Sequence, residues 1–274
     1  MDRKATARET LQILANGFYT YEGRTIEIAS LQKKSVEESI LYTPDMGENI
    51  LQKYKNGSGQ KPSVKMKTVN ISTVDALLQL EKDGKENVGI LNFASAKNPG
   101  GGFINGAMAQ EESLAASGGL YKTLTANEEY YRSNRACPSM IYTDYAIYSP
   151  EVVFFRDGRF QLLERPVTAS VLTLPAVNMG QVRLKGESEV DAQKAMKHRM
   201  ELALALFAEN GARTLILGAY GCGVFRNDPK QIAGWWREML DGTFADYFEE
   251  VVFAVLDKSK DQACYRAFNR VFEE

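Results

Sequence analysis

Two adjacent carboxylates follow a run of three glycines in the stretch NPGGGFINGAMAQEES, residues 98–113. Glu111 and Glu112 diverge by about 100° if they lie on a helix, so they cannot act as equivalent catalysts on one substrate face. One could bind while the other transfers a proton. A general acid near neutral pH needs a raised pKa, which burial, the neighbouring carboxylate or a bound anion could supply. The alternative is an ordinary pair of glutamates that stabilise a helix start.

A second unusual loop occurs in LILGAYGCGVFRND, residues 215–228. Both loops follow an apolar strand pattern and precede a helical one. Ligands of open α/β sheets bind beyond the carboxyl ends of strands, and glycine lets backbone N–H groups approach an anion closely. Two such loops facing each other would suit a nucleotide that carries a diphosphate. Neither a GxGxxG opening nor a GxxxxGK[ST] loop is present, so the known dinucleotide and P-loop motifs are not indicated. Simple tight turns remain the alternative.

The elements that must position these loops alternate along the chain. Apolar or alternating runs predict strands at 23–30, 64–72, 87–95, 146–157, 167–177, 212–221 and 249–257. Amphipathic runs predict helices at 5–16, 72–84, about 111–124, 188–211, 228–240 and 258–274. The segment 33–44 is helical or irregular. Alternation of this kind indicates a largely parallel or mixed sheet between helical layers. The Gly-, Ser- and Pro-containing segment 56–63 is typical of a linker, and suggests an N-terminal extension (1–63) packed on a core (64–274).

Composition narrows the class of protein. The chain has 274 residues and a net charge of −2, so no general basic field attracts nucleic acid or membrane. No apolar run approaches the roughly 20 residues of a membrane span. The three cysteines form no disulfide framework, and we expect a cytoplasmic protein. We expect no metal and no cofactor, with the single histidine, His198, on a solvated face. Trp235 and Trp236 fit packing better than base stacking.

The glycine triplet, a gap of seven residues and then Gln-Glu-Glu resembles the signature of the poly(ADP-ribose) glycohydrolase family. The longer stretches LNFASAKNPGGGFINGAMAQEESL, LGAYGCGVF and YSPEVVFFRD are similar to its bacterial-type members. The resemblance implies a three-layer α/β/α macrodomain with a central mixed sheet and an N-terminal, mainly helical extension. It also implies hydrolysis of the ribose–ribose bonds of poly(ADP-ribose), with ADP-ribose as product, mainly from chain ends. We expect a monomer that binds no membrane and no specific nucleic acid sequence.

The resemblance also implies roles for individual residues. Glu112 would be the catalytic acid/base, and Glu111 would orient the ribose through its hydroxyl groups. The loop Gly221 to Phe225 would wrap the diphosphate, with Phe225 against the distal ribose. The positions implied to contact substrate are Gln110, Asn92, Ala94, Asn98, Gly100, Gly101, Gly102, Gly221, Cys222, Gly223, Val224 and Phe225. Cys222 fits a small residue in a tight turn better than a nucleophile.

The chain departs from the family pattern directly after the glutamates. Members often continue with Leu-Cys-Arg and a later Ser, whereas this chain reads SLAASGGLY over residues 113–121. Gly118 and Gly119 would weaken a helix there by about 1 kcal/mol each relative to alanine. Two other functions therefore stay open. One is a hydrolase of single ADP-ribosyl groups on protein or nucleic acid, and the other is a non-catalytic ADP-ribose-binding macrodomain.

Overall fold

A computed structural model describes residues 2–55 and 64–273, and the suggested linker 56–63 lies outside these residues. The strands are β1 (Phe18–Tyr21), β2 (Arg24–Glu27), β3 (Ile40–Tyr42), β4 (Lys65–Val69), β5 (Val88–Ala94), β6 (Ala146–Arg156), β7 (Leu162–Pro175), β8 (Thr214–Leu217) and β9 (Glu250–Ala254). The helices are α1 (Arg3–Asn16), α2 (Ala29–Glu37), α3 (Pro44–Tyr54), α4 (Thr73–Lys82), α5 (Gln110–Ser117), α6 (Leu120–Ala126), α7 (Glu128–Ala136), α8 (Met179–Lys185), α9 (Glu189–Glu209), α10 (Pro229–Asp241) and α11 (Ala263–Phe272), with a 3-10 turn η1 (Phe103–Asn105).

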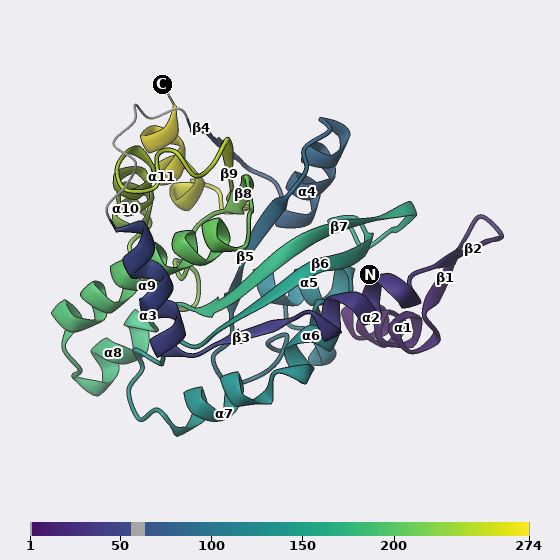
Figure 1. Ribbon diagram of the computed structural model, residues 1–274, viewed down its shortest axis with the longest axis horizontal. Helices are drawn as coiled ribbons and strands as arrows, with labels where there is room; N and C mark the ends of the chain where they lie inside the picture. Colours follow the sequence, from purple (N-terminus) through teal and green to yellow (C-terminus); the bar gives the residue numbers. More distant parts are fainter. Residues whose placement is uncertain (1, 56–63, 274) are drawn as a thin grey trace.

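A seven-stranded mixed sheet forms the centre of the molecule, in the order β3-β6-β7-β5-β8-β9-β4. The strands from β7 to β4 run parallel to one another, whereas β6 and β3 run antiparallel to their neighbours. Because β5 and β8 are adjacent and parallel, their carboxyl ends lie side by side, and the glycine loops that follow them begin at the same end of the strands (Figure 1). The mixed sheet that the sequence predicts is confirmed.

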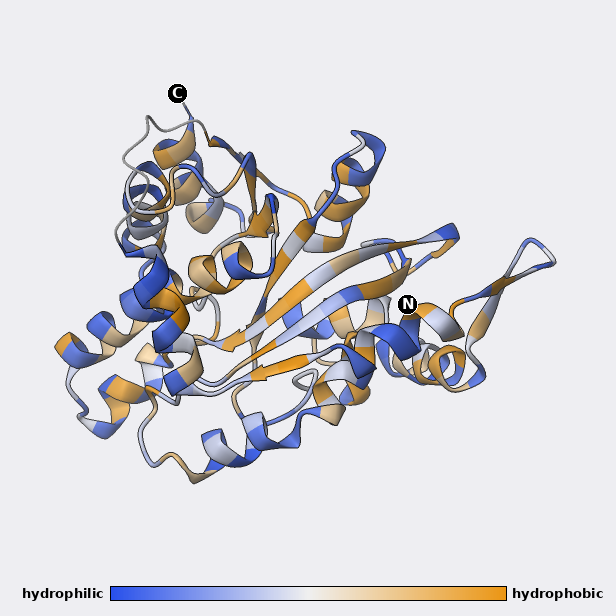
Figure 2. Ribbon diagram, viewed as in Figure 1, coloured by the Kyte–Doolittle hydropathy of each residue, from blue (hydrophilic) through white to orange (hydrophobic). Residues whose placement is uncertain are grey.

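Helices cover both faces of this sheet, which gives the expected three layers. Alternate residues of β9 point to opposite faces: Val251 and Phe253 join a core with α9, α10 and α11, and Val252 joins a core with α4 and α6. Figure 2 shows hydrophobic residues concentrated along the central strands. Among the described residues, no helix is long and apolar enough to cross a membrane.

The first 55 residues build mainly helices, and they also contribute to the main sheet. The short strand β3 pairs with β6 and forms one edge of the sheet. Leu51 of α3 is buried in the same core as α9. On the other side, Ile13 and Leu14 of α1 pack on Val153 and Phe155 of β6. The β1–β2 hairpin projects from this region (Figure 1).

The single helix expected over about 111–124 is wrong, because the chain breaks between α5 and α6 at Gly118 and Gly119. A Cβ atom on Gly118 would lie 2.2 Å from the carbonyl oxygen of Val153, and one on Gly119 would lie 2.0 Å from Oε1 of Gln32. The Gly119 N–H also donates to Val153 O at 2.8 Å. The glycines therefore allow close contact with β6 and α2 instead of loosening the helix.

Candidate active site

The carboxylate of Glu112 is held by backbone donors at the start of α5. Its Oε1 accepts from the N–H of Gly102 at 3.0 Å, and its Oε2 accepts from the N–H of Ala109 at 2.9 Å. In the second bond the side chain of the third helical residue caps the N–H of Ala109 at the helix start, as in one half of a capping box; the alanine side chain cannot make the other half. The glycine loop and α5 thus fix the same side chain from two directions.

Gly101 lies against both glutamates and has a φ of +60°. A Cβ atom at this position would sit 2.3 Å from Oε1 of Glu112 and 3.2 Å from Oε2 of Glu111. Gly100 also has a positive φ, of +67°. A left-handed backbone favours glycine at both positions, and at Gly101 the carboxylates also leave no space for a Cβ atom. The glycine triplet is therefore built around the carboxylates.

Glu111 is buried beside Glu112, with 3% of its surface exposed. Its Oε2 accepts from the N–H of Ser95 at 2.7 Å, and its Oε1 is 3.4 Å from Nδ2 of Asn92. Burial raises the pKa of Glu111 to about 8, and the charge of Glu112 adds to the rise, while hydrogen bonds from Ser95 and Asn92 oppose it. The two glutamates therefore differ in environment, as their sequential positions on a helix suggest.

Three of the residues expected to contact substrate pack closely within the protein around this arrangement. Gln110 donates through Nε2 to Leu91 O at 2.8 Å and accepts through Oε1 from Phe93 N at 2.9 Å, which ties α5 to β5. Asn92 is fully buried beneath Glu111, and Ala94 is 1% exposed. Asn98 is exposed in the loop. Asn92 therefore supports Glu111 and Gln110 holds α5 on β5, while contact of Gln110, Asn92 and Ala94 with substrate stays a prediction.

The second loop, Gly218 to Asn227, presents unused backbone donors. Asn227 braces it by donating from Nδ2 to Val177 O and Gly221 O, at 2.9 and 3.0 Å. Gly221 has a φ of +72°. In the described ranges, no protein group accepts from the N–H of Gly223, Val224 or Phe225. Such a run of free amides is suited to an anion.

The side chains of the second loop differ in exposure: Val224 is open to solvent, whereas Cys222 packs against the core. Val224 is 84% exposed, and no atom lies within 4 Å of a Cβ position on Gly223. The Phe225 ring lies 6.2 Å from the Tyr142 ring, centroid to centroid. Hydrogen bonding with the Cys264 thiol and burial raise the pKa of the Cys222 thiol well above its usual range. A raised pKa disfavours the thiolate, so Cys222 is poorly suited to act as a nucleophile.

The two tryptophans serve packing, as expected, and His198 is partly exposed. Trp236 is fully buried in the core of α9 and α10, and Trp235 packs against the same core. His198 is partly exposed, with Nε2 3.5 Å from Oε2 of Glu48 on α3. No group of three or more metal-binding side chains gathers within residues 2–55 and 64–273.

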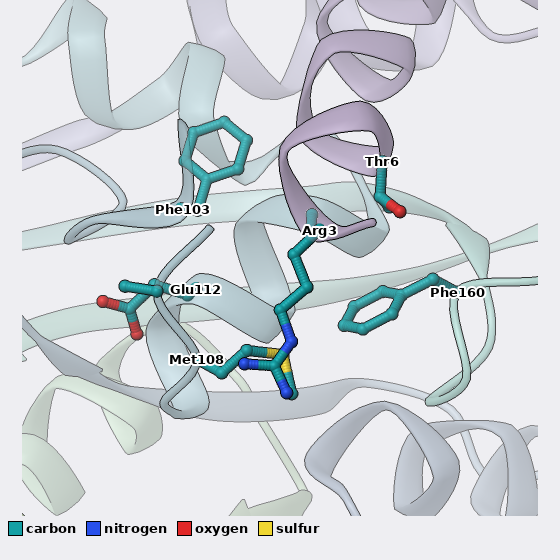
Figure 3. A pocket seen from close by; sticks show the side chains of 8 residues that line it. Arg3, Thr6, Phe103, Met108, Glu112 and Phe160 are labelled. Atoms are coloured by element: carbon teal, nitrogen blue, oxygen red, sulfur yellow. The ribbon is translucent and has the colours of Figure 1, made fainter. Parts of the chain in front are cut away.

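A small pocket beside Glu112 contains residues that sequence reasoning missed (Figure 3). Its lining residues are Arg3, Thr6, Phe103, Ala107, Met108, Glu112, Ala116 and Phe160. They come from α1, η1, the loop before α5, α5 itself and the β6–β7 turn. Hydrophobic contacts join Ala7 of α1 to Phe103 and Ala115. No local pattern in the sequence indicates that the first turn of α1 lies beside the glutamates.

Comparisons with known proteins show which family and which solved structures this chain is similar to. The family model for the microbial-type PARG catalytic domain matches residues 7–157, more than half of the chain. The crystal structure of poly(ADP-ribose) glycohydrolase (PARG) from Thermomonospora curvata has 38% identity and a TM-score of 0.94, covering 98% of this chain and 99% of that one. The same enzyme bound to the inhibitor ADP-HPD gives 38% identity and a TM-score of 0.90, covering 98% of each chain.

A second organism provides a similar structure. Poly(ADP-ribose) glycohydrolase from Deinococcus radiodurans in complex with ADP-ribose has 37% identity and a TM-score of 0.83, covering 90% of this chain and 98% of that one. A comparison with curated proteins found no match. The glycine-cradled glutamates, the mixed sheet and these similarities lead to one conclusion: the chain belongs to the microbial-type poly(ADP-ribose) glycohydrolase family, a family of enzymes.

Proposed function

We propose that the protein hydrolyses the ribose–ribose O-glycosidic bonds of poly(ADP-ribose) and releases ADP-ribose, mainly from chain ends. The observation that carries this proposal is the position of Glu112, held by two backbone N–H groups beside a glycine loop that leaves no room for side chains. Family membership supports it. The relatives from two organisms are named as enzymes of this activity, and one binds ADP-ribose in its crystal.

In the proposed mechanism, Glu112 acts twice. It first donates a proton to the oxygen that links the two riboses, so that this oxygen leaves with the shortened polymer and an oxocarbenium-like ribose remains. It then accepts a proton from the water that attacks this carbon, and ADP-ribose is the product.

We propose that the other site residues hold the substrate for this step. Glu111 accepts hydrogen bonds from ribose hydroxyls or donates one while it is protonated. The amides of Gly223, Val224 and Phe225 bind the diphosphate, and Phe225 contacts the distal ribose. Gly100 to Gly102 and Asn98 bring the catalytic loop, which we define as residues 98–109, close to that ribose.

The decisive experiment compares Glu112→Ala with wild type on purified poly(ADP-ribose). We expect the variant to lose ADP-ribose release, measured by chromatography, while calorimetry shows that it still binds ADP-ribose, because the diphosphate loop is untouched. Glu86→Ala is the control: this exposed glutamate precedes β5, at the opposite end of the strand from the site. A wild type that binds ADP-ribose but releases none from polymer or from singly modified substrates would show a non-catalytic macrodomain instead.

The second candidate function is removal of single ADP-ribosyl groups from protein or nucleic acid. It is motivated by Ala116 and Gly118, in the stretch where the arginine and a serine of the family pattern are missing; Ala116 packs here against α1. Parallel assays with polymer, a mono-modified peptide and modified DNA would separate the two functions. Faster release from a mono-modified substrate would favour the second candidate.

We also propose that the protein acts as a cytoplasmic monomer. Helices of the same chain cover both faces of its sheet, which supports the monomer. The three free cysteines, Cys137, Cys222 and Cys264, suit a reducing compartment. Light scattering after size-exclusion chromatography would test the oligomeric state.

A further inference from the structure

The first turn of α1 lies directly against the catalytic loop. A Cβ atom on Gly106 would be 3.2 Å from Cγ of Lys4 and 3.6 Å from Cβ of Arg3. Further along α1, Oγ1 of Thr10 donates to Ala116 O of α5 at 2.7 Å. A charged N-terminal turn is therefore fixed beside the helix that carries Glu112.

Arg3 extends from this turn over the loop that precedes α5. Figure 3 shows its side chain reaching Met108, with Phe160 on one side and Glu112 beyond the loop. Arg3 is exposed, and within the described ranges no ion pair involves it. The neighbouring carboxylate of Asp2 already accepts hydrogen bonds from the N–H groups of Lys4 and Ala5. The guanidinium is thus available to an external anion.

Exposed apolar side chains accompany this cation. Met108 and Ile104 belong to the same catalytic loop and are 44% and 45% exposed. Met108 lines the pocket together with Arg3, and Ile104 lies four residues earlier in the same loop, so their exposed side chains offer apolar surface near the cation. Arg3 offers a cationic contact and the two apolar side chains offer a hydrophobic one, which complement the phosphate and the base of an adenosine 5′-phosphate.

The direction of the reaction decides which part of a polymer would meet this surface. A general acid must touch the oxygen that leaves, so the leaving unit lies next to Glu112. If the loop Gly221 to Phe225 holds the diphosphate of the released ADP-ribose, the leaving adenosine lies on the other side of the scissile bond. The first turn of α1 borders Glu112 on its pocket side.

We propose that Arg3 binds a phosphate of the adjacent ADP-ribose unit, with Met108 and Ile104 against its adenosine, and that this contact favours polymer over singly ADP-ribosylated protein. The inference rests on the proposed function, since the adjacent unit of a polymer carries a phosphate on the leaving side and a singly modified protein does not. Guanidinium suits this role because it binds phosphate with paired hydrogen bonds.

The test compares Arg3→Gln with Arg8→Gln on two substrates. Arg8 is exposed on the same helix, and its five-residue separation places it about 140° around the axis, on another face. One substrate is poly(ADP-ribose), and the other is an aryl ADP-ribose, whose leaving group carries no phosphate. We expect Arg3→Gln to lower kcat/KM on polymer about tenfold, the loss of one charged contact. Activity on the aryl substrate and the Kd for ADP-ribose should stay unchanged.

The outcomes separate this inference from the proposed function. If wild type cleaves the aryl compound but not polymer, the proposed function fails, and the inference fails with it. If wild type cleaves polymer and the two variants behave alike, only the role of Arg3 is overturned. Equal losses on both substrates in Arg3→Gln would indicate a disturbed catalytic loop, which also overturns the inference. A weaker salt dependence of polymer cleavage in Arg3→Gln, but not in Arg8→Gln, would support it.

Discussion

At the scale of single residues, Gly101 is the position at which one added methyl group matters most. An alanine there would place Cβ 2.3 Å from the Glu112 carboxylate and would also hold a left-handed backbone. We expect Gly101→Ala to lower kcat/KM by roughly a hundredfold or more, because small displacements of catalytic groups have effects of this size.

The matched control is Gly84→Ala. Gly84 has a φ of +69°, but nothing lies within 4 Å of its Cβ position. Both variants should lose about 1–2 kcal/mol of unfolding free energy to the left-handed conformation. Only Gly101→Ala should lose activity. Polymer cleavage measures the activity of each variant, and urea denaturation measures its unfolding free energy. Equal activity in the two variants would mean that the clash with Glu112 has no effect on the reaction.

The buried carboxyl of Glu111 should make stability depend on pH. Its pKa rises from 4.5 to about 8 on folding, mainly through burial, so between these values the folded protein holds a proton that the unfolded chain has lost. This contribution to stability is complete below pH 4.5 and is lost as pH rises through about 8. Glu111→Gln removes the titration.

Thermal unfolding between pH 5 and 9 would check this. We expect the Tm of Glu111→Gln to rise relative to wild type as pH increases, because only wild type must bury a charge at high pH. The exposed control Glu86→Gln should follow wild type throughout. Parallel curves for Glu111→Gln and wild type would contradict a raised pKa.

Local sequence indicated part of this site, and its limits are visible at particular residues. The spacing of glycines and glutamates indicated that Glu111 and Glu112 must differ in role, and the structure gives them different environments. The sequence could not distinguish residues that line the site from residues that hold the glutamates in place. Asn92 bonds to Glu111 and Gln110 bonds to β5, and both contacts depend on how α5 packs on β5. Arg3 could not be placed at all, since its position beside Glu112 is a contact between distant segments.

At the scale of elements, long periodic runs were predicted well and short ones were not. Strand β5 and helix α9 agree with their patterns, because a buried strand and a capped amphipathic helix have strong local signals. The three residues of β3 have no such signal, and their strand conformation comes from pairing with β6. Helix α3 was missed although Thr43 caps it and Pro44 begins it, a start signal that the sequence does contain.

The break between α5 and α6 shows the same limit. Glycine pairs weaken a helix in isolation, and the sequence suggested a looser one. In the folded protein, Gly118 forms a bridge to Phe154 of β6, so the absence of a side chain serves close packing. The sequence predicted a weakened but continuous helix, and the break at the two glycines follows from tertiary contact with β6.

At the scale of the whole molecule, the N-terminal region is interleaved with the rest. Tyr42 and Leu51 share a core with α9, and α1 covers Val153 and Phe155 of β6. Both β6 residues are fully buried. Since burying one large apolar side chain is worth about 1.5–3 kcal/mol, these contacts together are comparable with the roughly 5–15 kcal/mol that stabilises a typical protein. We therefore propose that the extension and the catalytic core form one cooperative unit.

A chain that begins at residue 64 tests this unit. It would expose Val153 and Phe155 and leave the edge of β6 without β3, so we expect it to aggregate or to unfold without a cooperative transition. In the full chain, fluorescence of Trp235 and Trp236 in α10 reports on a helix distant in sequence from the extension. Its urea transition should coincide with that of far-UV circular dichroism. A truncated chain that unfolds cooperatively at the same midpoint and still binds ADP-ribose would show instead that residues 64–274 are an independent domain.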